Sequence, residues 1–321
     1  MRKVFLAVFT MAALLLASLS ATGVSSADPA PTEQSADWVL GTFNLAAHRG
    51  VNNQFGIIGE LLANWPPVIN IAPPCDDCDI TSLVPDLTDT NGNSVNMDAG
   101  PMLHHMVLGE QLGSDQACGF NPDLIPMRRI FASGNERTTV PRVPGYGLYI
   151  PKGQRYIMID DLMNYSNQPQ TVQVRLHVTY VPGHTLKPVT PVWLDETGCN
   201  FPPSYFDVPA GQSHQTMTWT SNITGKLIGL GGHLHENGVH ISATDLTTNT
   251  PLCDSVESQM SMGTDSGPET MVTGMTKCVG SGDDPVAVIH TGDKIQMDSY
   301  YNAPTAQQGV MGIMIMYVDP S

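Results

Sequence analysis

Hydrophobic residues in this chain recur in short runs that alternate with polar residues, and turn-forming residues separate the runs. The 321 residues include 30 glycines and 25 prolines spread along the whole length. Alternation with a period of two is typical of β-strands, and helical periodicity is scarce. We therefore expect an all-β protein, with strands that include residues 102–109, 147–150, 155–159, 171–181, 213–220, 226–235, 239–246, 286–290, 294–301 and 310–318.

One interruption of this pattern divides the chain. The segment 182–188 contains Pro, Gly and a second Pro, and a fresh series of expected strands follows it. We predict two tandem antiparallel β-sandwich domains of jelly-roll-like type, at residues 38–183 and 184–321, each of about 140 residues. Residues 28–37 are expected to form a flexible leader.

The N-terminus has the pattern of a secretory signal. Arg2 and Lys3 precede an apolar run from Val4 to Leu16, and small residues follow up to Ala27. Residues 1–27 are therefore expected to be a signal peptide that is cleaved near Ala27, which makes the protein secreted. The run is short for a membrane span, and no later stretch approaches the length that a span needs.

The charge balance disfavours some classes of binding partner. Thirty acidic residues oppose 14 basic ones, so the formal net charge is −16. Such acidity disfavours binding to nucleic acid or to an anionic membrane. An unknown small molecule is the expected partner, and the sequence leaves the oligomeric state open.

All six cysteines follow the expected cleavage site. An even number of cysteines in an exported protein indicates disulfides, with a redox or zinc pair at the Cys-x-x-Cys motif as the alternative. Plausible bridges are Cys253 with Cys278 and Cys78 with Cys118, but the sequence cannot choose a complete connectivity. The candidates are Cys75, Cys78, Cys118, Cys199, Cys253 and Cys278.

Two histidine pairs lie far apart in the chain, His104-His105 and His233-x-His235. Imidazole is the commonest protein metal ligand. On a strand, the two rings of a His-x-His point to one face and can reach the same ion. Adjacent histidines face opposite ways in a regular strand, so His104 and His105 share an ion only if a bulge or kink intervenes. His177, on another expected strand, could complete a three-imidazole site.

The dipeptide Asn237-Gly238 suggests a tight hairpin after the second pair. Counting back from that turn places His233, His235 and His240 on one face of the hairpin. His240 is therefore a candidate third ligand. A zinc site built from these three histidines, structural or hydrolytic, is one alternative reading.

Methionine is frequent, with 17 residues, and several lie on the C-terminal strand. A thioether is a soft ligand that suits Cu(I), although a methionine in a strand more often fills the core. Met311 is the candidate ligand here and Met314 is the fallback.

These motifs resemble the copper type II, ascorbate-dependent monooxygenases, the group of the peptidylglycine α-hydroxylating and dopamine β-monooxygenases. A closer resemblance, to the stress-up-regulated nodulin-like family, is carried by Cys75–Ile80, Ala99–His105, Ser133–Thr138, Asp161–Asn164 and Gly309–Gly312.

The resemblance implies two copper ions. His104, His105 and His177 match the copper that stores an electron, whereas His233, His235 and Met311 match the copper where oxygen is activated. An external reductant such as ascorbate would supply the electrons. The peptide-amidating enzymes carry an Arg where this chain has Gly231, and a Tyr on the terminal strand where it has Met or Ile. Peptide amidation is therefore not expected.

Three functions remain open at this stage. The first is a secreted copper monooxygenase that hydroxylates an unknown small substrate. The second is a non-catalytic copper-binding or stress protein on the same scaffold, and the third is the zinc site described above.

Overall fold

The computed structural model describes residues 32–48, 67–119, 127–199, 205–264 and 267–320. The expected signal peptide lies outside this described part. Residues Thr32–Ser321 form one compact unit. The described residues form strands, apart from loops and one 3-10 turn, η1 (Met97–Ala99), so the all-β prediction is confirmed.

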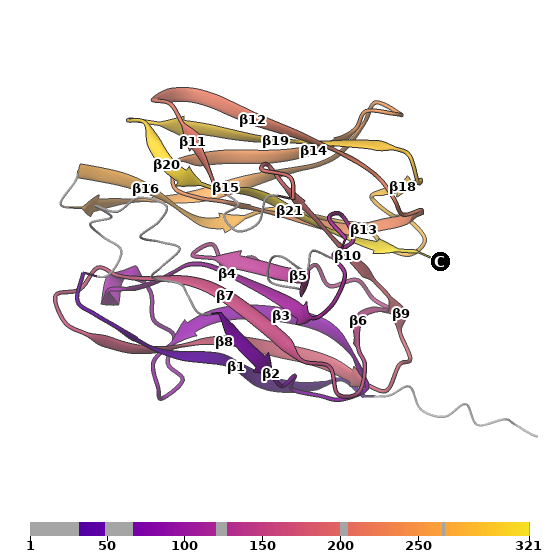
Figure 1. Ribbon diagram of the computed structural model, residues 1–321, viewed down its shortest axis with the longest axis horizontal. Coiled ribbons are helices and arrows are strands. Elements are labelled where there is room, and N and C mark those ends of the chain that lie inside the picture. The colour runs from indigo at the N-terminus through magenta and orange to yellow at the C-terminus, as the bar shows by residue number, and fades with distance from the viewer. Residues whose placement is uncertain (1–31, 49–66, 120–126, 200–204, 265–266, 321) are drawn as a thin grey trace, which may run out of the picture. The chain divides into compact units, whose positions relative to one another are not determined.

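Four principal sheets make up this unit (Figure 1). The first contains β1 (Gln34–Leu45), β8 (Gln170–Pro182), β3 (Cys78–Thr88), β6 (Tyr146–Ile150) and β9 (Lys187–Pro188). The second contains β2 (Val68–Ile71), β7 (Tyr156–Asn164), β4 (Pro101–Gln111) and β5 (Met127–Gly134). Pairing is antiparallel except between β6 and β9.

The other two sheets come from the C-terminal half. The third contains β10 (Thr190–Asp195), β21 (Gly312–Asp319) and β13 (Gly225–Leu234), with β17 (Lys277–Val279) and β18 (Ala287–Ile289) both paired to β13. The fourth contains β12 (Gly211–Thr220), β19 (Lys294–Ala303), β14 (Gly238–Asp245), β15 (Thr250–Thr264) and β16 (Gly267–Met275). A small pair joins β11 (Phe206–Val208) to β20 (Gln307–Val310).

Three layers of apolar side chains hold the sheets face to face. One lies between the first and second sheets, with residues such as Leu83 and Leu108. Another lies between the third and fourth, with residues such as Leu230 and Met297. The middle layer joins the second sheet to the third, through residues such as Ile157 and Ile313. Burying each such side chain is favourable by about 1.5–3 kcal/mol, so the middle layer stabilises the contact between the two halves.

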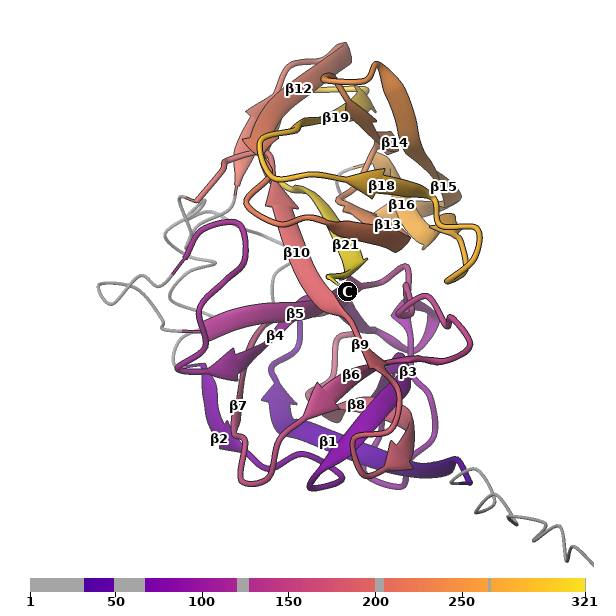
Figure 2. The ribbon, with the colours of Figure 1, turned by 90° about the vertical axis from the view of Figure 1, so that its right-hand side faces the viewer.

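The pair of sheets in each half can be followed in Figure 2, where β10 runs from one half to the other.

The first strand departs from the sequence prediction, because β1 begins at Gln34 and pairs with β8 from Tyr180. Residues 34–37 are thus part of a sheet, although the hydropathy pattern assigned them to a flexible leader. Their polar side chains lie on an exposed sheet edge, which explains why the pattern there is weak.

All six cysteines form disulfides: Cys75–Cys78, Cys118–Cys199 and Cys253–Cys278. The prediction of disulfides is confirmed, as is the Cys253–Cys278 bridge. The suggested Cys78–Cys118 bridge is wrong, because Cys78 bonds its near neighbour in the chain.

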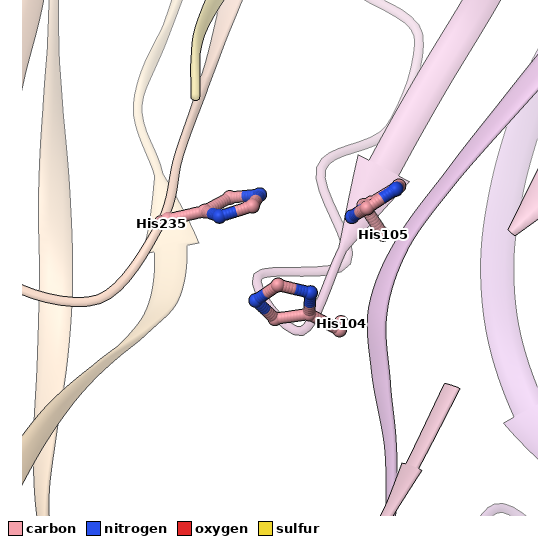
Figure 3. Close-up of side chains that lie close together, drawn as sticks. All are labelled: His104, His105 and His235. Atoms are coloured by element: carbon pink, nitrogen blue, oxygen red, sulfur yellow. The ribbon is translucent and has the colours of Figure 1, made fainter. Parts of the chain in front are cut away.

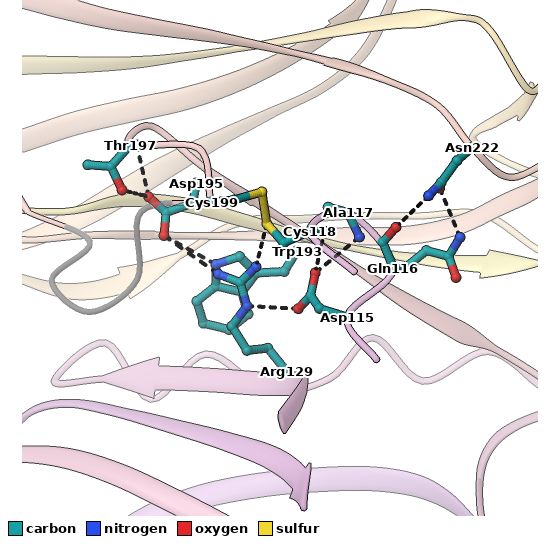
Figure 4. Close-up of a disulfide and its surroundings, with 10 residues drawn as sticks. All are labelled: Asp115, Gln116, Ala117, Cys118, Arg129, Trp193, Asp195, Thr197, Cys199 and Asn222. Atoms are coloured by element: carbon teal, nitrogen blue, oxygen red, sulfur yellow. Dashed lines mark hydrogen bonds and ion pairs between the residues drawn. A yellow bond between two sulfur atoms is a disulfide. The ribbon is translucent and has the colours of Figure 1, made fainter. Parts of the chain in front are cut away.

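The Cys118–Cys199 bridge ties the two halves together beside a buried arginine (Figure 4). Arg129 Nε donates to Asp115 at 2.8 Å, and its Nη1 lies 3.8 Å from a carboxylate oxygen of Asp195 on β10. Arg129 stands on β5, so one guanidinium links strands of the second and third sheets. A buried charge needs such partners to be tolerated.

Candidate metal centre

A β-bulge on β4 places His104 and His105 at the face that meets the other half. The pairing of β4 with β7 shifts between Leu103 and His105. Without that shift, adjacent side chains would point to opposite faces. Leu103 packs in the core between the first and second sheets, whereas both histidines lie in the cluster described below. Adjacent histidines on a strand can share an ion only at a bulge or kink, and β4 contains such a bulge here.

The second histidine pair lies at the end of β13. His233 pairs with Ile313 of β21, and Leu234 pairs with Gly312. Ile313 belongs to the middle apolar layer, so His233 and His235 share that face. The ladder ends at Gly312, and beyond it the Tyr301 hydroxyl accepts from the His235 amide and donates to the Met311 carbonyl. Met311 is also buried in the middle layer.

Three of these histidines converge from the two halves (Figure 3). One ring nitrogen from each of His104, His105 and His235 lies within 4.8 Å of the others, and all three residues are buried. The ring centroids of His104 and His235 are 4.3 Å apart, and those of His105 and His235 are 5.6 Å apart. The spacing suits three ligands around one ion. We call these residues the histidine trio.

Unpartnered nitrogens within the trio are available to a ligand. His105 Nδ1 and His235 Nε2 are buried and have no hydrogen-bond partner among the described residues. An unsatisfied buried polar atom costs about 1–3 kcal/mol. Unpartnered nitrogens on two members of one cluster fit a metal ion, which accepts their lone pairs.

Two carboxylates hold His104. Asp161 on β7 lies 2.8 Å from Nδ1, and Glu236 lies 3.3 Å from Nε2. Burial alone would lower the pKa of His104, but Glu236 and Asp161 outweigh it and raise the pKa well above its usual range. Because Asp161 occupies Nδ1 at close range, Nε2 is the atom left for a metal. A metal there replaces the proton that Glu236 now stabilises.

The other two members of the trio are held neutral. Burial lowers the pKa of His105 to about 3. Burial also lowers the pKa of His235 well below its usual range, with the neighbouring His104 as the next cause. Tyr205 places its hydroxyl 3.4 Å from His105 Nε2, and the backbone of Gly309 hydrogen-bonds His235. A neutral imidazole is the form that binds a metal.

His233 lies beside the trio and is anchored from the opposite half. Its Nδ1 is 3.0 Å from the carboxylate of Glu136, which follows β5. Burial would raise the pKa of Glu136, but His233 and backbone amides, including that of Gly134, outweigh it and lower the pKa. Since a carboxylate accepts, Nδ1 carries the hydrogen and Nε2 has a free lone pair. That Nε2 is buried without a hydrogen-bond partner in the described structure.

His177 does not join this cluster. It lies on β8 of the first sheet, its side chain is 57 % exposed, and its Nδ1 bonds Asp37 at 3.0 Å. The expected set of His104, His105 and His177 is therefore not assembled. The alternation of β8 explains this, because its neighbours Leu176 and Val178 point into the core and His177 must point out.

His240 and Met314 also lie elsewhere. The Asn237-Gly238 turn does not close a hairpin, because β13 pairs with β21 and β14 pairs with β15 and β19. His240 stacks on Tyr300 and bonds Asp254 at 2.6 Å, so the predicted zinc set with His233 and His235 is not formed. Met314 packs into the core between the third and fourth sheets, on the opposite face from the histidines.

Sequence reasoning missed the residues that orient the histidines. Asp161, Glu136, Glu236 and Tyr205 come from four separate segments. Glu236 had a detectable signal, since it directly follows His235. Glu136 and Asp161 lie in two segments that carry the family resemblance, Ser133–Thr138 and Asp161–Asn164, which was a signal for them. Tyr205 has no such signal, and the contacts of all three with the histidines appear only in the folded chain.

These features define a candidate metal centre of buried imidazoles, set between the two halves of an all-β protein. Three imidazoles suit Zn, Cu, Fe or Ni. Carboxylates on outer imidazole nitrogens, as Asp161 provides here, are usual around protein metal sites. The donor set therefore fits copper.

Two curated proteins resemble the chain. "Probable copper-dependent oxygenase M1" from Phoma sp. is 27 % identical over 271 residues, which cover 78 % of this chain and 66 % of that protein. "Probable copper-dependent oxygenase clz3" from Cochliobolus lunatus is 24 % identical over 249 residues, covering 71 % of this chain and 75 % of that protein. The match thus leaves about a third of the Phoma protein uncovered. Both names support a copper oxygenase-like relationship.

No protein-family model matches the chain, so the resemblance to the nodulin-like family stays an expectation. Among solved structures, a peptide-N(4)-(N-acetyl-β-D-glucosaminyl)asparagine amidase gives a TM-score of 0.41 at 11 % identity, over 88 % of this chain and 97 % of that one. A likeness at this level carries no argument about function.

Proposed function

We propose that this protein is a copper-dependent oxygenase whose copper is held by His104, His105 and His235. The observation that carries the proposal is the convergence of three buried imidazoles, two of which have an unpartnered nitrogen. The names of the two curated relatives support copper over the other metals that such a site suits.

The proposal places one copper ion in the protein instead of the two that the sequence resemblance implies. The electron-storing site lacks its third ligand, because His177 is exposed and paired with Asp37. His105 and His104 instead face His235. Met311, which directly precedes β21, is buried in the middle layer and is the candidate for an additional weak ligand.

The reaction class is hydroxylation of an unknown small substrate. One oxygen atom of dioxygen enters a C–H bond, the other leaves as water, and an external reductant such as ascorbate supplies two electrons with two protons. Copper bound at the trio would supply the one-electron chemistry with dioxygen that side chains lack.

The surrounding residues have separable roles. Asp161 orients His104 through Nδ1, and the Gly309 backbone orients His235. His233 presents an Nε2 lone pair beside the trio, because Glu136 holds the proton on Nδ1. His233 Nε2 can therefore accept a hydrogen bond from a group bound beside the trio. The burial of all four histidines keeps bulk water away from the reacting centre.

Export is part of the proposal. Three disulfides are consistent with an extracellular protein, and the N-terminal pattern suggests a cleaved signal. The described part of the chain has no helix with the length and hydropathy of a membrane span. We further propose that the two pairs of sheets are tandem sandwich domains, with the metal centre between them.

The test is metal content of the protein after separate reconstitution with copper and zinc, followed by ascorbate-driven oxygen uptake in the same samples. We expect one copper per chain and oxygen uptake that zinc does not support. Bound copper without uptake over a broad panel of small substrates would favour a non-catalytic copper-binding protein. Retention of zinc alone would contradict the proposal.

A further inference from the structure

A small cavity lies in the middle apolar layer, and one of its wall residues stands beside the histidine trio. We call it the seam cavity, because strands of the second and third sheets both line it. Its wall includes Ala132 from β5, Gly231 and His233 from β13, and Ile313 and Ile315 from β21. The ring centroid of His233 lies 5.2 Å from that of His235, so the wall of the cavity reaches the metal centre.

The seam cavity includes space that a side chain at residue 231 could occupy. Gly231 and Gly232 are adjacent on β13, so they face opposite sides of the strand. A Cβ on Gly232 would lie 2.3 Å from Ile241 Cγ2, so close packing requires glycine there. A Cβ on Gly231 would meet nothing nearer than Thr138 Cγ2 at 3.5 Å, which is an ordinary contact. Packing therefore does not require glycine at residue 231, and its small size leaves the space open.

The size of the seam cavity restricts what can occupy it. Its volume is about 20 Å³. By the same measure, a cavity needs about 10–15 Å³ to hold one water molecule. An organic substrate is too large for such a space. A molecule of one or two heavy atoms fits.

The wall of the seam cavity is apolar where an occupant would touch it. Thr138 Oγ1 and His233 Nε2 belong to lining residues, but other atoms cover both of them, so neither faces the cavity. Thr139 Oγ1 already accepts a hydrogen bond from Lys277 Nζ. A buried water needs two to four polar partners, and cavities lined by carbon stay dry and take up apolar guests such as xenon. The seam cavity therefore suits an apolar guest better than water.

A second cavity continues the same apolar space. Its volume is also about 20 Å³, and it shares the wall residues Pro141 and Tyr317 with the seam cavity. The rest of its wall is mostly apolar, with residues such as Leu83 and Ile228. The two cavities thus form a row along the contact between the halves, and the row ends at His233.

We propose that the seam cavity binds dioxygen and delivers it to the metal centre past His233. Dioxygen is diatomic and apolar, so it matches both the size and the wall of the cavity. No bond forms or breaks in the cavity itself. This inference rests on the proposed oxygenase function, because that function consumes dioxygen at the trio.

Xenon is the probe for binding, because it is apolar and unreactive. Methyl NMR spectra of the reduced, copper-loaded protein would be recorded without oxygen, before and after pressurising with xenon. We expect shifts at the methyl groups of Ile313 and Ile315, and none at Ile289 in the core between the third and fourth sheets. In Gly231→Val the added side chain occupies the cavity, so these shifts should fall about fivefold or more.

The matched control is another strand glycine with room for a side chain. Gly274 on β16 does not line the seam cavity, and a Cβ there would meet nothing nearer than 3.4 Å. Gly274→Val should therefore leave the xenon shifts unchanged. Ala132→Leu guards against misfolding of the first variant, because it fills the same cavity from β5 and should have the same effect as Gly231→Val.

The dependence of oxygen uptake on dioxygen concentration shows whether the cavity serves the reaction. We expect Gly231→Val and Ala132→Leu to raise the half-saturating dioxygen concentration about fivefold or more. The maximal rate and the copper content should stay unchanged, because neither variant alters the trio. Gly274→Val should match the parent in all three measurements.

The outcomes separate this proposal from the oxygenase function. Absence of xenon shifts at Ile313 and Ile315 in the parent would overturn the proposal and leave the oxygenase function standing. An unchanged dioxygen dependence in both filled variants would do the same. Xenon shifts in a parent that binds copper without oxygen uptake would instead overturn the oxygenase function and the delivery of dioxygen, and only a site for an apolar gas would remain.

Discussion

Glu136 Oε1 lies 3.0 Å from His233 Nδ1, so a carboxylate of the N-terminal half fixes a histidine of the C-terminal half. The same oxygen accepts from the Gly134 amide at 2.8 Å. A Cβ on Gly134 would lie 2.4 Å from the His104 carbonyl oxygen and 2.9 Å from His233 Cε1. The two halves therefore meet at a point where only glycine fits, and the metal centre is assembled there.

Replacing Glu136 with Gln tests the role of His233. Glutamine keeps the shape but removes the charge that fixes the proton on Nδ1. We expect oxygen uptake to fall about 10–100-fold while the copper content stays unchanged, because His233 is outside the trio. Elemental analysis and oxygen-electrode traces on the same samples measure both. Glu33→Gln, on the surface, serves as the control; loss of copper from Glu136→Gln would show that His233 is itself a ligand.

Asp161→Asn tests the orientation of His104. Loss of the carboxylate should weaken copper binding about 10–100-fold, since outer partners of ligating imidazoles have effects of that size. Competition with a copper chelator gives the affinity. The control is Asp37→Asn, which removes the carboxylate from the exposed His177 in an equivalent pair. Equal effects of the two substitutions would argue against the assigned centre.

Copper binding should depend on pH through His104. Because this pKa is raised, the metal-free protein keeps a proton on His104 at pH values where an ordinary histidine has lost it. Copper must displace that proton. Affinity should therefore fall by about tenfold for each pH unit below that pKa, as expected for release of one proton per ion. Chelator competition between pH 6 and 9 measures the slope. A flat profile would mean that His104 is not a ligand.

Glu196 should make the protein less stable in mild alkali. Burial raises the pKa of Glu196 to about 8, although a hydrogen bond from Ser299 at 2.7 Å opposes the shift. The folded state then binds a proton that the unfolded state releases above about pH 4.5, so this contribution is lost as pH rises through 8. Urea unfolding at pH 6.5 and 9 should show a larger decline for the parent than for Glu196→Gln. Identical declines would place the titrating group elsewhere.

Much of the fold could be predicted from the alternation of residues, and the limits have physical causes. Strands such as β4, β8 and β21 alternate or run apolar because their faces are buried on one or both sides. β1 escaped detection because its polar edge weakens the pattern. The turn at Asn237-Gly238 has the composition of a hairpin, but each flanking strand finds partners in a different sheet. Such pairing depends on contacts between strands that are far apart in the sequence.

The candidate site could likewise be predicted from the sequence only in part. Both histidine pairs could be identified from spacing, and the need for a bulge at His104 followed from the period of a strand. The third ligand that joins His104 and His105 could not be identified from the sequence, because His177 and His235 are equally plausible there. Only the packing of the second sheet against the third brings His235 to the pair.

The most direct test of the central claim is the copper content of three single variants, His105→Ala, His235→Ala and His177→Ala, each reconstituted and analysed beside the parent protein. We predict one copper per chain in the parent and in His177→Ala, and none in the other two, because one ion requires ligands from both halves. Two coppers in the parent, with one lost in His177→Ala and one retained in His235→Ala, would contradict a joint site and restore two separate ones.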